Sequence, residues 1–155
     1  MSDRKLIHAI RDQFALDWHG LHGVRHWARV RQNGLLLCER TGARRQIIEL
    51  FAFLHDSRRL SDGLDSEHGA RAAEFAASLA GTLIHLSRED LSLLTFACEH
   101  HSHGRMEGDI TVLTCWDADR LDLGRVGYYP DSKRLCTPAA RDPWMIRSCY
   151  ERSKK

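Results

Sequence analysis

The sequence predicts an all-α protein that folds as a single compact bundle of about six or seven helices. Apolar residues recur at helical spacing along almost the whole chain, whereas β-branched runs of alternating polarity are scarce. The 155 residues suit one domain with a substantial core, and the chain contains no internal repeat or low-complexity linker. We therefore expect residues 1–155 to form one domain.

Three helices are predicted in the first part of the chain, at 3–17, 24–40 and 44–56. In the first of them, Leu6 and Ile10 lie on one face, and a turn with two glycines follows it. The second helix ends near Gly42, because glycine is favoured just beyond a helix C-terminus. The third runs through Ile48 and is followed by a loop with turn-forming residues.

Four more helices are predicted at 66–80, 87–101, 109–123 and 143–153. Ser87 is followed three residues later by Asp90, a pattern that resembles a capping box and marks a helix start. The stretch 124–142 contains glycine and proline and is predicted to be an ordered loop. It could close over a pocket, or form a flap over the preceding helix.

Composition excludes several classes of protein. A formal net charge of +2, without a basic stripe of interleaved aromatic residues, gives no reason to expect a nucleic-acid partner. No apolar run approaches the roughly 18 residues of a membrane span, and the N-terminus lacks the features of a signal peptide. The five cysteines include no CxxC pair. We expect a cytoplasmic protein without a membrane partner; the sequence leaves its oligomeric state open.

Ionisable residues interrupt the apolar faces of five different predicted helices: these are His26, His55, His68, His101 and Asp119. A single histidine on such a face is commonly a hydrogen-bonded core residue, but burying an unpaired carboxylate costs several kcal/mol. Five such residues directed at one core need a common partner, and a divalent cation is the simplest. Imidazole and carboxylate ligands suit Mn, Fe, Co, Ni or Zn, and the absence of thiolate ligands argues against a purely structural zinc.

The doublet His55-Asp56 ends a predicted apolar helix, and this position is informative. Neighbouring helical residues project about 100° apart, but at the last turn both can reach one ion. The alternative is a helix C-terminus whose negative dipole end is compensated by histidine. That alternative accounts for His55 but not for Asp56, because an anion there opposes the dipole.

Three segments, "HGLHGVRHWARV", "FLHDSRR" and "CWDADRLDLGR", together resemble the HD-domain superfamily of metal-dependent phosphohydrolases. The resemblance covers roughly residues 19–127, leaving a C-terminal loop and helix at 128–155. It implies that His26, His55, Asp56 and Asp119 bind a divalent metal, which could also be Mg. Asp117 is an alternative last ligand, but Asp119 precedes Arg-Leu, as the ligand does in many relatives.

The implied activity is hydrolysis of a small phosphate ester, most simply a nucleotide, by metal-activated water with Asp56 at the centre. Candidate cations for the phosphate are Arg58, Arg59 and Arg120, each of which could equally be a solvated surface charge. Asp122 could orient water or a sugar hydroxyl, or could be a carboxylate at a helix end. His22 is expected near the pocket.

Two further interpretations follow from the histidines. In some HD-like proteins, extra histidines at similar places hold a second metal, a role open here to His68 and His101, although His100 and His103 compete with His101. A pair of metals also permits oxygen-dependent chemistry, so a di-iron oxygenase is one alternative function. A domain that binds a metal or nucleotide as a sensor, without turnover, is another.

Overall fold

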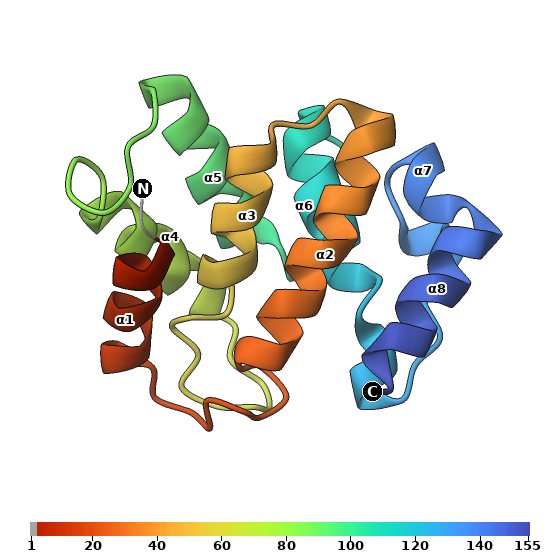
Figure 1. The fold of residues 1–155 in the computed structure, drawn as a ribbon, viewed down its shortest axis with the longest axis horizontal. Helices are drawn as coiled ribbons and strands as arrows, with labels where there is room; N and C mark the ends of the chain where they lie inside the picture. Colours follow the sequence, from red (N-terminus) through yellow and green to blue (C-terminus); the bar gives the residue numbers. More distant parts are fainter. Residues whose placement is uncertain (1–2) are drawn as a thin grey trace.

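The computed structural model describes residues 3–155, and in this range the regular secondary structure is helical, which confirms the all-α prediction. Its elements are α1 (Asp3–Gln13), α2 (Val24–Thr41), α3 (Arg45–Leu54), α4 (His68–Ser78), α5 (Arg88–His100), α6 (Ile110–Arg120), the 3-10 turns η1 (Leu123–Val126) and η2 (Ser132–Arg134), α7 (Pro138–Arg141) and α8 (Pro143–Ser153) (Figure 1). The described part of the chain contains an isolated bridge between Ala80 and Ile84 but no named strand. No helix in it combines the length and apolar character that crossing a membrane requires.

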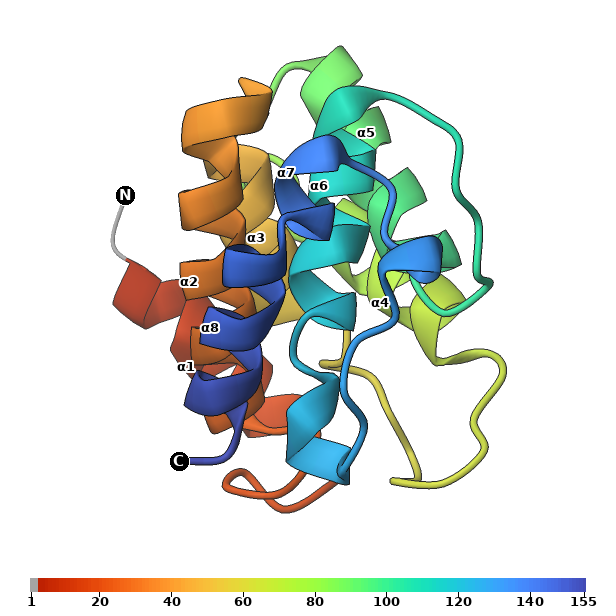
Figure 2. The ribbon, with the colours of Figure 1, turned by 90° about the vertical axis from the view of Figure 1, so that its right-hand side faces the viewer.

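Helices α2, α3, α5 and α6 enclose the core. Helix α2 packs against both α3 and α6, while α4 lies along α5, and α7 and α8 cover the far side of α2 (Figures 1 and 2). Trp27, Phe51 and Trp116 are the largest side chains that are fully buried. Burial of each side chain of this size contributes roughly 1.5–3 kcal/mol, so the core is built mainly where these four helices meet.

Several helix boundaries differ from the prediction. Helix α1 ends at Gln13 and not near residue 17, because the ring of Phe14 turns inward and packs edge-on against Trp18 and Trp27. The predicted helix 109–123 is shorter, at Ile110–Arg120. The stretch 124–142 holds the extra short helix α7, which begins at Pro138 and is capped by Thr137. The described residues therefore contain eight α-helices, one more than predicted.

Two glycines permit close backbone approaches that shape the site. Gly23 caps α2, and a Cβ there would collide with the carbonyl of Trp18, so the tight turn before α2 requires glycine. Gly69 follows the first residue of α4, where a Cβ would lie 2.5 Å from the carbonyl oxygen of Glu99 and 2.7 Å from that of Cys98. Glycine at this point lets α4 cross α5 at backbone contact.

Candidate metal centre

The ends of five helices bring six predicted ligands together. His26 lies in the first turn of α2 and His55 caps the C-terminus of α3, with Asp56 directly after it. The other three are His68, the first residue of α4, His101, which caps the C-terminus of α5, and Asp119, near the end of α6. The contributing ends of α2 and α3 lie in the lower half of Figure 1. Because these helices are fixed by core packing, their ends hold the side chains in place.

One group of ligand atoms is formed by His26, His55, Asp56 and Asp119. The Nε2 atoms of His26 and His55 are 3.1 Å apart, and both lie 3.3 Å from Oδ2 of Asp56. Oδ1 of Asp119 lies 3.2 Å from Nε2 of His26 and 3.4 Å from Nε2 of His55. The two imidazoles are fully buried, whereas the side chain of Asp119 is 18% exposed, so this group opens toward solvent at Asp119.

A second group shares Asp56 with the first. Oδ1 of Asp56, the other oxygen of the same carboxylate, lies 3.4 Å from Nε2 of both His68 and His101. These two Nε2 atoms are 2.9 Å apart. Asp56 therefore points one oxygen at each group, and the two histidines that each oxygen faces are buried.

The hydrogen bonds of the four imidazoles fix their protonation pattern. Each Nδ1 faces an oxygen acceptor: Oδ2 of Asp122 for His26 at 2.7 Å, the carbonyl of Phe51 for His55 at 3.0 Å, that of Asp65 for His68 at 2.5 Å and that of Cys98 for His101 at 2.6 Å. Each Nδ1 must therefore carry the proton and donate it, which leaves Nε2 with a lone pair in the neutral ring. Metal-binding histidines in proteins are oriented in this way.

This donor set fits a metal ion. Four Nε2 lone pairs and three carboxylate oxygens face one another in a buried space, and without a proton or cation between them they would repel. Nitrogen and oxygen ligands in this combination suit divalent transition metals. The groups His26–His55–Asp56 and Asp56–His68–His101 could therefore each hold a metal ion, and Asp119 lies beside the first of them.

The pKa values describe the same cluster with protons in place of metal. Burial lowers the pKa of His55, but the carboxylates of Asp56 and Asp119 outweigh burial and raise it to about 10. In return, although burial raises the pKa of these two carboxyls, the neighbouring histidines bring both well below the usual value. Burial and the adjacent His101 lower the pKa of His68 to about 4, so this ring is neutral at pH 7 and ready to act as a ligand.

Neither a family model nor a curated protein matches the sequence. A solved structure that resembles this one is the crystal structure of a predicted HD superfamily hydrolase from an uncultured Thermotogales bacterium. The two chains are 26% identical and superpose with a TM-score of 0.73, over 96% of this chain and 84% of the other. The resemblance to the HD-domain superfamily is confirmed.

Asp122 lies behind His26, on the side of the ring away from the other predicted ligands. Its carboxylate is fully buried, accepts a hydrogen bond from His26, and accepts another from Nε of Arg29 at 2.7 Å. Arg125 donates to the Asp122 carbonyl. Asp122 therefore orients His26 and does not face a water or sugar hydroxyl. The sequence left two roles open for Asp122, orienting a water or sugar hydroxyl or a carboxylate at a helix end, and nothing in it indicated the contact with His26.

The three arginines predicted to bind phosphate make different contacts. Arg59 is at the centre, with Nε 3.2 Å from Oδ1 of Asp56. Arg58 points away, because it donates to Oε1 of Gln13 and its guanidinium lies over the ring of Phe75. Arg120 donates to the carbonyls of Arg105 and Arg134 and so joins two loops beside the site.

Asp117, the alternative last ligand, is directed away from the centre. Its carboxylate accepts hydrogen bonds from the backbone N–H groups of Cys136 and Thr137, at 2.7 and 2.9 Å, and from the Thr137 hydroxyl. Burial raises its pKa although these hydrogen bonds oppose the shift. Asp117 therefore anchors the segment that follows η2, and Asp119 is the aspartate of α6 that reaches the histidines.

The remaining histidines near the site lie outside both groups. Nδ1 of His22 is 2.7 Å from Oδ1 of Asp62, and its ring centroid lies 6.5 Å from that of His26. His100 and His103 face each other, with their Nδ1 atoms 3.0 Å apart on the surface. Of the three histidines in "EHHSHG", His101 is therefore the one that meets His68.

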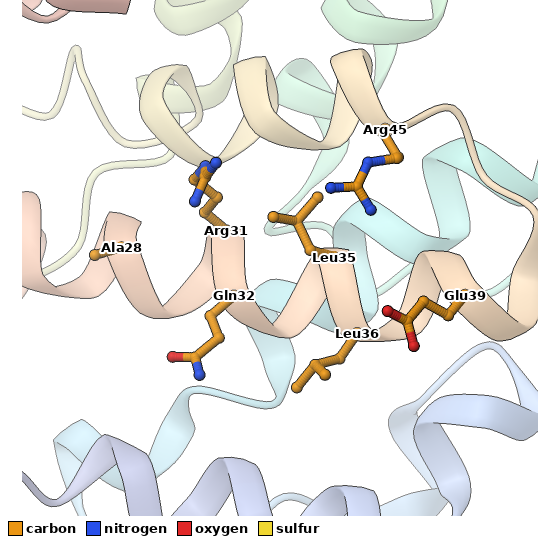
Figure 3. Close-up of a pocket in the computed structure, with 7 residues that line it drawn as sticks. All are labelled: Ala28, Arg31, Gln32, Leu35, Leu36, Glu39 and Arg45. Carbon is orange, nitrogen blue, oxygen red and sulfur yellow. The ribbon is translucent and has the colours of Figure 1, made fainter.

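A cleft of about 770 Å³ adjoins the second group, because His101 forms part of its lining. Its other walls come from the loop after α5 and from the segment between η1 and α7. A smaller hollow of about 360 Å³ lies on the outer side of α2, near Arg31 and Arg45 (Figure 3). The smaller hollow contains none of the predicted ligands, so of the two it is the cleft at His101 that adjoins a ligand group.

Proposed function

We propose that this protein is a metal-dependent phosphohydrolase that acts on a small phosphate ester such as a nucleotide. The observation that carries the proposal is the convergence of four histidine Nε2 atoms on a shared Asp56 beside a cleft with basic residues. The similar solved structure, of a predicted HD superfamily hydrolase, supports the same class of reaction.

In this proposal, separate residues hold the metal, orient a ligand and neutralise the phosphate. A bound divalent ion supplies a Lewis acid and lowers the pKa of water to near neutrality. Asp56 and the histidines would hold the metal, and Asp122 keeps His26 in the tautomer that this requires. Arg59, fixed against Asp56 and the carbonyls of its own loop, offers positive charge next to the site of reaction. The cations of the cleft hold the rest of the phosphate ester.

The test is release of phosphate or pyrophosphate by purified protein. Protein loaded with Mn, Co, Ni, Fe, Mg or Zn is incubated with a panel of nucleotides and other phosphate esters, and Asp56→Asn protein serves as the control. We expect metal-dependent turnover that the substitution abolishes. Tight ligand binding without turnover across the panel would contradict the proposal and favour a sensor domain.

A di-iron oxygenase is the second candidate function, and one observation favours it. Asp56 faces both ligand groups, as a carboxylate between two metals would. Elemental analysis and an oxygen electrode distinguish the two functions. Two irons per chain with oxygen consumption on addition of an organic substrate would support the oxygenase, and oxygen-independent phosphate release would exclude it as the main activity.

A further inference from the structure

The cleft beside His101 is bordered by a segment that exposes two aromatic rings, residues 127–135. Tyr128 is 67% exposed and Tyr129 is 56% exposed, and both line the cleft. The ring of Tyr129 packs against Tyr150, with centroids 4.9 Å apart. Within residues 3–155, Tyr128 has no aromatic or cationic partner at stacking distance.

This exposure is not a consequence of a loose loop. The N–H of Tyr128 donates to the carbonyl of Leu123 at 3.2 Å, and Arg120 bonds the carbonyl of Arg134 at 2.9 Å. Directly after the segment, Asp117 holds two backbone N–H groups. An apolar ring kept in water by a well-anchored backbone forgoes the free energy of burial, which is expected where a ligand covers the ring.

Two exposed basic side chains of the same cleft, those of Lys133 and Arg134, are available to an anionic ligand. Arg120, Lys133 and Arg134 line it, and within the described residues none of them has a carboxylate oxygen within 4.0 Å. Asp131 also lines the cleft, but its Oδ1 accepts from the N–H of Lys133. The hollow on α2 differs, since it is lined by Glu39 (Figure 3). In addition, Arg31 of this hollow pairs with Glu49 at 3.5 Å.

We propose that the cleft binds the body of a phosphorylated substrate whose flat apolar ring stacks on Tyr128, and whose anionic groups meet Lys133 and Arg134. The proposal rests on the proposed function, because His101 belongs to both the cleft and the metal centre. The cleft volume of about 770 Å³ is in the range of pockets that enclose ligands of this size. Tyr128 is then a specificity-determining residue that selects ring-bearing phosphates over compact ones.

Two probes isolate the contribution of the ring: AMP and ribose 5-phosphate carry the same phosphate on the same sugar carbon, and only AMP carries a flat base. Their affinities for the metal-loaded protein are measured by calorimetry, or as KM values if they are hydrolysed. We expect AMP to bind more tightly. We expect Tyr128→Ala to weaken the binding of AMP roughly tenfold, as loss of a base–aromatic stack does, and to leave the affinity for ribose 5-phosphate unchanged.

Matched variants complete the experiment. Tyr128→Phe keeps the ring face and should retain the affinity for AMP. Trp144→Ala removes an exposed ring outside the cleft and should leave the affinities for both probes unchanged. Lys133→Gln should lower the affinities for both probes by the same factor. Equal affinity for AMP and ribose 5-phosphate, or AMP binding that Tyr128→Ala does not alter, would overturn the proposal. Calorimetry detects binding whether or not the probes are hydrolysed, so a failure of hydrolysis alone does not imitate this result.

Discussion

Replacing Gly69 by alanine should disable one ligand group while sparing the other. The new Cβ would lie 2.5 Å from the carbonyl oxygen of Glu99, whereas ordinary van der Waals contact begins at 3.4 Å. Relief therefore requires α4 and α5 to separate by about 0.9 Å, the difference between those two distances. Metal sites tolerate ligand displacements of only about 0.2 Å, so His68 would no longer share an ion with His101.

The displacement also strains His101 directly. The second carbonyl that the Cβ would approach, that of Cys98, is the one that accepts the Nδ1–H of His101. Overpacking of this kind costs roughly 1–3 kcal/mol, which lowers the Tm of a domain of this size by roughly 3–10 °C. Elemental analysis should find the metal content of Gly69→Ala falling from two ions per chain to one, and calorimetry should find the lower Tm.

Gly63→Ala is the matched control, because the nearest atom to its Cβ is Oγ of Ser61 at 3.5 Å and its φ is not positive. It should keep the metal content and change stability by less than about 0.5 kcal/mol. A Gly69→Ala protein with wild-type Tm and two ions per chain would refute the close-approach argument. Loss of both ions at unchanged Tm would refute the assignment of the displacement to the second group alone.

Three further predictions concern the centre itself. Asp56→Asn should remove both ions and lower activity more than about a hundredfold, because one carboxylate serves both groups; elemental analysis and turnover check this. Asp119→Ala should weaken metal binding in the first group, whereas Asp117→Ala should leave metal content intact and lower the Tm by freeing the segment at Cys136. In chelator-treated protein, the pKa of His55 is raised from 6.5 to about 10, so protonation of this ring stabilises the folded state. This stabilisation is fully present below pH 6.5. That contribution is lost as the pH rises toward 10, so denaturant titrations should show a decline there that metal-loaded protein lacks, and a flat profile would contradict the coupling.

The convergence of these side chains could be predicted because helical spacing and residue type agree at each position. His26, His55, His68 and His101 interrupt apolar faces, and helix ends converge in a bundle of this fold. The two aspartates of α6 were harder to tell apart as candidate ligands. Asp117 and Asp119 are about 200° apart around the helix, and Asp117 is fully buried because the segment at Cys136 covers its face, whereas the side chain of Asp119 is 18% exposed. Burial alone therefore could not distinguish a ligand from an anchor.

Beyond the helix ends, the spacing of residues in the sequence no longer determines where a side chain points. Arg58 and Arg59 are neighbours after α3, and only the path of the loop sends one to Gln13 and the other to Asp56. Likewise, the partner of Asp122 lies 96 residues earlier in the chain, in another helix. The cleft walls at 101–106 and 123–135 are formed by irregular segments whose contacts depend on Arg120 and Asp117, so no local pattern could reveal them.

The shared carboxylate also sets an electrical balance for the whole centre. Four neutral imidazoles and the carboxylates of Asp56 and Asp119 bring two negative charges, whereas a pair of divalent ions brings four positive ones. The surplus attracts an anion, and occupancy by ions and by an anionic ligand must then favour each other by the same factor. Starving the protein of either component should consequently loosen its hold on the other.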